Sequence, residues 1–313
     1  MTSHRGQRKD GYEQDMMMRG KHRRIFLTAV IGPVLFLQGC MTYQSDWNAA
    51  RADYPRRDVS GLLELANSRA NSADSKVAVK ESIEAYEKVL HDDPLNYEAL
   101  SSLAHLYLLL GDEQGNGIPQ KKEFYLKAIK YAEHAMYMNQ DFRHLIDKGE
   151  QVWEAVSVLT EKELEPMLFW TTGIFYYYKD CLGAAGQVIN FHWIRRAQRV
   201  LQRMSAIDPD YAGGAVYFTW ALYYLAIPES VGGDREKSKE LFVHALETGP
   251  NWLINRWGRA KYYHVKMKNR DEFIEDLQWV IVQDIRKAEG HYAWKSFYKR
   301  DAERMLENVD NIF

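Results

Sequence analysis

The chain has 313 residues, of which 46% are hydrophobic and 27% are charged, and its formal net charge is −2 at pH 7. This balance lacks the excess of basic residues that nucleic-acid binding requires, so we expect no nucleic-acid partner. Cys40 and Cys181 are the only cysteines, which excludes a disulfide framework and leaves packing to hold the fold together.

The first predicted element is an export signal. Lys21, Arg23 and Arg24 precede an apolar run from Ile25 to Gln38, which is shorter than the ~20 apolar residues needed to span a bilayer. A basic region, an apolar stretch and a small residue, here Gly39, follow one another in a secretory signal. We therefore expect residues 1–39 to be a signal peptide.

The end of this segment, Leu37-Gln38-Gly39-Cys40, resembles the lipobox of bacterial lipoproteins, which implies that Cys40 carries a lipid. Two or more acyl chains hold a protein stably on a membrane. The alternative is an ordinary signal peptide followed by a chance cysteine. With lipidation, residues 40–60 form a tether, the protein is anchored in the cell envelope and faces the periplasm, and Met41 favours the outer membrane.

Residues 61–313 are predicted to be helical throughout. Apolar residues recur at spacings of three and four, and the helical segments are interrupted at Asp93-Pro94, Gly111-Asp112, Asp208-Pro209, Gly232-Gly233 and Gly249-Pro250. No stretch shows the sustained alternation of a strand. The sequence therefore predicts an all-α fold.

A repeat underlies this helical region. Tyr86, Pro94, Leu103, Ala104 and Tyr107 stand where the 34-residue tetratricopeptide (TPR) pattern places its aromatic, proline, leucine, small and tyrosine residues. We expect about four degenerate repeats, stacked as a TPR-like solenoid of antiparallel helix pairs. Loops are predicted at 111–120 and 179–190, an extra helix near 145–161, and a closing C-terminal helix at 292–311.

A family resemblance appears near the C-terminus. Gly232-Gly233-Asp234 is followed by Phe242, Ala245 and Leu246 and then by Tyr262 and Tyr263, and this order resembles the T-component family of TRAP transporters (TatT-like proteins). The resemblance covers roughly 165–313 and, less closely, 76–140. It implies an exported helical-repeat lipoprotein that works beside a periplasmic solute-binding P-component. In some members it implies a homotrimer with a passage through each subunit.

Three consecutive tyrosines suggest a second apolar face. Tyr176, Tyr177 and Tyr178 lie 100° apart on a helix, so they cannot all point into one core. We assign Tyr176 to the packing stripe and Tyr177 to a stripe on the concave surface. The residues predicted to line a ligand groove or passage are Met167, Trp170, Ile174, Tyr177, Tyr178, Phe218, Leu222, Leu225, Ile254, Trp257, Lys261 and His264. The alternative is that these helices are simply buried on both sides.

Motifs for catalysis and cofactor binding are missing from the sequence. The histidines show no zinc-binding spacing, and neither a G-x-S-x-G motif nor a P-loop occurs. We expect Cys181 to pack as a small apolar residue. The sequence thus predicts a protein that is not an enzyme and has neither metal nor cofactor.

Two functions remain at this point. One is an accessory protein of a TRAP-type uptake system that binds a P-component and an apolar or organic-acid solute. The other is a structural TPR scaffold lipoprotein for envelope assembly without a small-molecule site.

Overall fold

The computed structural model describes residues 41–51, 57–113 and 117–313. Cys40, the predicted signal peptide 1–39 and part of the predicted tether lie outside these described residues. The division into signal peptide, tether and repeat domain therefore stays a prediction.

Contacts divide the chain into two compact units. In the described part of the chain, the smaller unit holds Met41 and Thr42 together with Leu182–Phe191. Its described part contains helix α10 (Ala184–Ile189), where the prediction placed a loop. The backbone N–H of Met41 donates a 2.8 Å hydrogen bond to Oδ1 of Asn190. The larger unit holds Tyr43–Cys181 and His192–Phe313, and the rest of the description concerns this unit.

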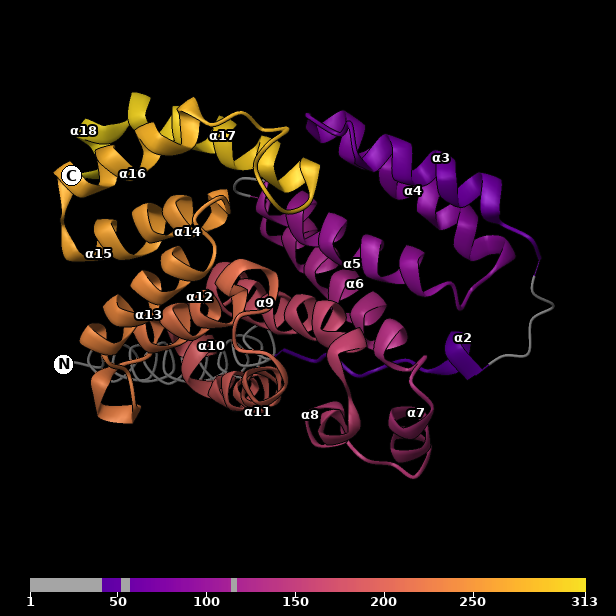
Figure 1. Cartoon of the computed structure of the whole chain (residues 1–313). Coiled ribbons are helices and arrows are strands. Elements are labelled where there is room, and N and C mark those ends of the chain that lie inside the picture. Colours follow the sequence, from indigo (N-terminus) through magenta and orange to yellow (C-terminus); the bar gives the residue numbers. More distant parts are fainter. Residues whose placement is uncertain (1–40, 52–56, 114–116) are drawn as a thin grey trace, which may run out of the picture. The chain divides into compact units, whose positions relative to one another are not determined.

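The described residues contain helices and no strands, which confirms the predicted all-α class. In the first half of the larger unit (Figure 1) the helices are α2 (Asn48–Arg51), α3 (Ser60–Ala70), α4 (Lys76–Asp92), α5 (Tyr97–Asp112), α6 (Ile118–Met136), α7 (Gln140–Asp147), α8 (Val152–Ala155), the 3₁₀ turns η1 (Val156–Val158) and η2 (Glu161–Glu163), and α9 (Leu164–Cys181). Neighbours in the chain from α3 to α6 pack on one another, and α9 packs on α6 and α5. The regular TPR repeat stays a prediction.

The second half continues in the same way. Its elements are α11 (Phe191–Ile207), α12 (Tyr211–Ala226), the 3₁₀ turn η3 (Glu229–Val231), α13 (Arg235–Thr248), α14 (Leu253–Gly258), the π-helix η4 (Arg259–His264), α15 (Val265–Met267), α16 (Arg270–Val282), α17 (Tyr292–Glu307) and α18 (Val309–Ile312). Helices α12 and α13 pack as a pair, α17 packs on α16 and α14, and α17 also reaches α5. The predicted closing helix corresponds to α17 and α18.

Short polar side chains fix where several helices begin. The side chains of Ser75, Asn96 and Asp234 accept hydrogen bonds from backbone N–H groups in the first turns of α4, α5 and α13. Such caps satisfy donors that the helix itself leaves unpaired.

The segment predicted as one extra helix near 145–161 is instead split into α7, α8 and two 3₁₀ turns.

The segment before α3 is docked on the helices. The Tyr43 hydroxyl donates a 2.7 Å hydrogen bond to Oε2 of Glu133, the Trp47 ring stacks on Tyr137, and Nε2 of His134 lies 2.6 Å from the carbonyl oxygen of Asp46. Residues 43–47 therefore form part of the packed unit, although they lie within the range predicted as a tether.

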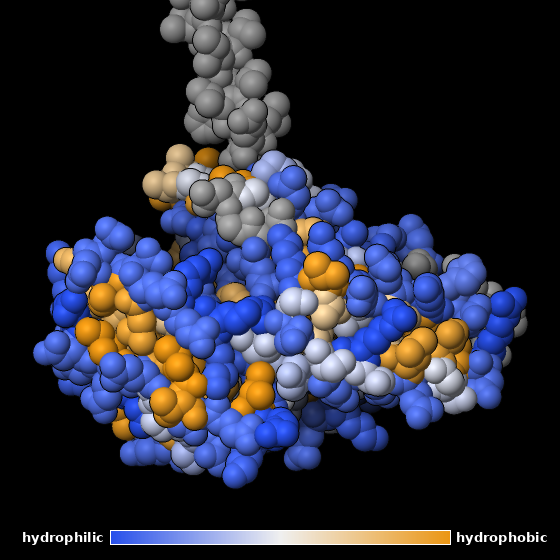
Figure 2. Space-filling model, turned by 90° about the horizontal axis from the view of Figure 1, so that it is seen from above, coloured by the Kyte–Doolittle hydropathy of each residue, from blue (hydrophilic) through white to orange (hydrophobic). Residues whose placement is uncertain are grey.

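The surface is mostly polar on the face drawn in Figure 2, where hydrophobic residues gather in a few separate patches. Exposed apolar side chains such as Leu65, Val77 and Val282 come from three different helices. Among the described residues no helix has both the length and the apolar character to cross a bilayer.

Candidate solute-binding site

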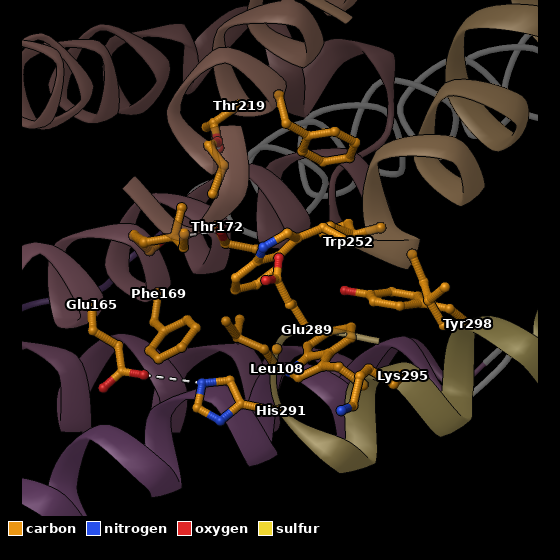
Figure 3. A pocket seen from close by; sticks show the side chains of 18 of the residues that line it. Leu108, Glu165, Phe169, Thr172, Thr219, Trp252, Glu289, His291, Lys295 and Tyr298 are labelled. Atoms are coloured by element: carbon orange, nitrogen blue, oxygen red, sulfur yellow. Dashed lines mark hydrogen bonds and ion pairs between the residues drawn. The ribbon is translucent and has the colours of Figure 1, made fainter. Parts of the chain in front are cut away.

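The larger unit contains a partly open cavity of about 370 Å³, called the main cavity below. Helix α9 supplies one wall through Glu165, Leu168, Phe169, Thr172 and Tyr176, which recur at helical spacing along one face. Figure 3 shows several of these side chains directed into the space. Aromatic rings make up much of the lining, namely Phe169, Phe175, Tyr176, Tyr211, Phe218, Trp252, Trp294 and Tyr298.

An unusual turn shapes the wall opposite α9. Ala212, Gly213 and Gly214 all have positive φ angles, 49°, 63° and 83°, so the start of α12 contains a short left-handed segment. A Cβ atom added to Gly213 would lie 2.1 Å from the Trp252 ring. The left-handed turn therefore lets the Trp252 ring pack directly against the backbone, and both Ala212 and Trp252 line the cavity.

Asn255 holds this turn in place. Its Nδ2 lies 2.9 Å from the carbonyl oxygen of Gly213, 2.7 Å from that of Ala245 and 3.1 Å from that of Gly249. The amide side chain is fully buried, so these hydrogen bonds satisfy a donor that would otherwise be costly to bury. Asn255 thereby connects α12, α13 and α14 behind the cavity.

A second, more polar cavity of about 460 Å³ adjoins the first and is called the side cavity below. Asn71, Glu165 and His291 line both spaces. Nε2 of His291 lies 3.0 Å from Oε1 of Glu165, as drawn in Figure 3, and the His291 ring stacks on His105 at a centroid distance of 4.0 Å. This histidine–carboxylate pair therefore stands at the border between the two cavities.

The surroundings fix the ionisation states of Glu165 and of His105, which stacks on His291. Burial, together with the nearby His291, holds the pKa of His105 well below its ordinary value, so His105 is neutral. Burial tends to raise the pKa of Glu165, but hydrogen bonds from His291 and Ser101 outweigh it and leave that pKa below its ordinary value. Glu165 is therefore ionised at the cavity border.

Charged side chains also cluster around the π-helix η4. Nζ of Lys261 lies 3.2 Å from Asp301 and 3.6 Å from Asp112. The buried Tyr262 hydroxyl has no hydrogen-bond partner among the described residues. Lys261 and Tyr262 belong to the π-helix η4, a feature often found at functional sites.

The predicted ligand residues fall into three groups. Those that line the main cavity are Phe218, Leu222 and Ile254. Those buried in the core away from its lining are Met167, Trp170, Ile174, Tyr177, Leu225, Trp257 and His264. Tyr178 and Lys261 are partly exposed, and neither lines a cavity described here. That any of the twelve binds a ligand stays a prediction.

Hydrogen bonds inside the fold satisfy the polar groups of two of these buried residues. Trp170 donates from Nε1 to Oε1 of Glu133 at 2.9 Å, and Trp257 donates from Nε1 to Oδ2 of Asp301 at 2.9 Å. Nε2 of buried His264 lies 3.3 Å from Oδ2 of Asp276, an ion-pair contact that does not meet hydrogen-bond geometry. Each tryptophan thus satisfies its N–H inside the fold.

Sequence reasoning missed the residues that complete the cavity. Trp252 stands just before α14, and Glu289 and His291 come from the connection that leads into α17. These positions lie outside the helical pattern, so periodicity gave no signal for them. The Gly213-Gly214 pair was a usable sign of a positive-φ turn.

Clusters of three or more histidine, cysteine or acidic side chains arranged to hold a metal ion do not occur in the described part of the chain. No curated protein matches the chain significantly. All residues that line the main cavity except Asn71 and Leu108 lie within the segment matched by a family model. That model, the TRAP transporter T-component, matches residues 111–313, which is more than half of the chain, and the chain therefore belongs to this family.

Proposed function

We propose that this protein is a lipid-anchored, periplasm-facing accessory component of a TRAP-type uptake system, which binds the solute-binding P-component and holds a partly apolar solute in the main cavity. Membership of the TRAP transporter T-component family supports a role in this kind of transport. This is a family of transporter accessory proteins rather than of enzymes, and we propose no catalytic step.

The main cavity is the observation that carries the solute-binding part. Its volume of about 370 Å³ lies within the range of roughly 300–1,000 Å³ that is usual for small-ligand pockets. Apolar and aromatic side chains line most of it, and a few polar groups such as Glu165 and Thr172 stand among them. The sequence suggested two solute classes, namely an apolar solute and an organic acid with an apolar body.

Binding to the P-component is tested directly with the two purified proteins. We expect isothermal titration calorimetry to give saturable binding between this chain and the P-component of the same uptake system. Sedimentation of the free protein then tests whether it forms the homotrimer that the family resemblance implies. Absence of binding, together with normal folding, would favour the second candidate.

That second candidate is a structural scaffold for envelope assembly without a solute site. The deep burial of Trp170, Ile174 and Met167 favours it, because these apolar positions are filled by packing.

Anchoring at Cys40 is tested by intact mass. We expect the protein from membranes to be heavier than the chain from Cys40 to Phe313 by a diacylglyceryl group, and we expect Cys40→Ser to release the protein from the membrane fraction. Separation of inner and outer membranes then tests the proposed outer-membrane location.

A further inference from the structure

The ionisable groups that line the two cavities are unevenly distributed. Carboxylates are contributed by Glu165 and Glu289 to the main cavity and by Glu98 and Glu165 to the side cavity. Among the described residues that line either cavity, Lys295 is the one lysine or arginine. A solute in the main cavity therefore meets two carboxylates, of which Glu165 is already paired with His291, and one lysine.

The single cation is directed elsewhere. Nζ of Lys295 donates a 2.7 Å hydrogen bond to the carbonyl oxygen of Ala288, and in Figure 3 the amino group points away from Trp252 and the centre of the cavity. Glu289 extends toward the Trp252 ring in the same view. The carboxylate of Glu289 has no ion-pair partner among the described residues, so it is free to meet a charge on a ligand.

The aromatic lining adds a second attraction of the same sign. The face of an aromatic ring carries negative partial charge, and cations within ~6 Å of a tryptophan or tyrosine ring are stabilised by about 0.5–2 kcal/mol. Trp252, Trp294, Tyr176 and Tyr298 all contribute rings to the main cavity. Cages of aromatic rings are a recurring way in which proteins bind quaternary ammonium groups.

An organic acid would meet the opposite environment. Its carboxylate would lie near ionised Glu165 and near Glu289, and like charges repel, although water weakens the effect of the exposed Glu289. His291 could supply a compensating donor, but its Nε2 is already 3.0 Å from Glu165. The lining therefore disfavours an anion.

We propose that the main cavity binds a small organic cation, with its ammonium group beside Glu289 and the aromatic rings and its apolar body against α9 and α12. This inference rests on the proposed role in solute uptake and names the class of solute.

The test uses three ligands that share a phenyl group and differ in charge. Benzyltrimethylammonium, phenylacetate and 2-phenylethanol are titrated into the full-length protein in detergent, and binding is measured by isothermal titration calorimetry. We expect the ammonium compound to bind roughly tenfold more tightly than the other two, which corresponds to about 1.4 kcal/mol. The difference should shrink at high salt.

Three variants locate the charge. Glu289→Gln should weaken ammonium binding roughly five- to tenfold and leave 2-phenylethanol unchanged. Glu289→Lys should reverse the order, so that phenylacetate binds more tightly than the ammonium compound. Glu303→Gln is the matched control, because Glu303 is an exposed α17 residue that lines neither cavity, and it should bind all three ligands like the unmodified protein.

Tighter binding of phenylacetate, equal binding of all three ligands, or binding of none would overturn the inference. The P-component titration is read separately. Retained P-component binding with no ammonium preference would reject only the solute class, whereas ammonium binding without P-component binding would reject the uptake role and keep the cation site.

Discussion

The two faces of helix α9 differ in what lies against them. On one face, Trp170 and Ile174 are fully buried, and Trp170 is hydrogen-bonded to Glu133 of α6. On the other face, Phe169, Thr172 and Phe175 line the main cavity. Both faces are apolar enough to be core, so the neighbouring elements decide which one is filled.

Close approach fills the first face. A Cβ atom on Gly173 would lie 2.7 Å from Cγ1 of Ile129, so α6 approaches α9 as near as a glycine permits. On the cavity face the facing wall contains the left-handed segment at residues 212–214 and the Trp252 ring, which packs against the backbone there instead of against α9. An apolar helix face therefore becomes a cavity wall when its neighbour's side chains are engaged elsewhere.

The largest expected effect comes from truncating one large side chain on each face of α9. Trp170→Ala should lower the free energy of unfolding by about 3–5 kcal/mol, because it leaves a large hole in the core and removes a donor from buried Glu133. Phe175→Ala, on the same helix but at the half-buried cavity wall, should cost less than about 2 kcal/mol. Urea denaturation of both variants measures the difference, and equal losses would contradict the comparison.

A pH dependence probes the same buried contact. Burial raises the pKa of Glu133 to about 7 from the ordinary 4.5, although hydrogen bonds from Trp170 and Tyr43 act in the other direction. The folded state thus binds this proton more tightly than the unfolded state. Its contribution to stability is complete below pH 4.5 and is lost as the pH rises through 7. The loss amounts to roughly 3 kcal/mol.

The measurement is the free energy of unfolding between pH 4.5 and 8, made on the unmodified protein and on Glu133→Gln. The glutamine variant should lack this part of the decline, because it has no proton to release. Parallel curves for the two proteins would show that Glu133 titrates normally in the folded state.

The spacing between α6 and α9 is tested by a single methyl group. Gly173→Ala should destabilise the protein by about 1–3 kcal/mol, since the new Cβ overlaps Ile129. Gly61→Ala in α3 is the control, because a Cβ there has nothing within 4 Å and alanine favours a helix. The melting temperature of Gly61→Ala should therefore be higher than that of Gly173→Ala. The reverse order would mean that α6 and α9 can move apart without loss of stability.

The smallest expected effect compares two adjacent threonines. The Thr171 hydroxyl is buried without a hydrogen-bond partner among the described residues, whereas Thr172 donates to the carbonyl oxygen of Leu168 at 2.8 Å and lines the cavity. Thr171→Val should raise the free energy of unfolding by about 1 kcal/mol, because an unpaired buried hydroxyl is removed. Thr172→Val should change it by less than about 0.5 kcal/mol. A destabilised Thr171→Val would reveal an unseen partner, such as a buried water.

The helices were largely readable from the sequence because local signals end them. Helix α4 ends at Asp92, just before Pro94, and α13 ends at Thr248, before Gly249-Pro250. The closing helix was predicted at 292–311 and is present as α17 and α18, which meet at Asn308. Proline and glycine act within a few residues, so these boundaries need no knowledge of the tertiary structure.

The cavity was harder to predict because it depends on contacts between distant segments. Periodicity indicated that α9 has two apolar faces, and the prediction placed Tyr177 on the ligand side and Tyr176 on the packing side. In the structure Tyr176 lines the main cavity, whereas Tyr177 is buried away from its lining. Helical spacing defines each face but carries no information on whether α6 or Trp252 will lie opposite.

The left-handed turn at residues 212–214 limits how this protein's relatives can diverge. Neither Gly213 nor Gly214 has room for a methyl group, since one would strike Trp252 and the other the backbone of Ala245. Substitutions of these two glycines should therefore be selected against. Sequence changes that reshape the main cavity in a relative are therefore expected on α9 or in the connection at 289–291, while the turn stays constant.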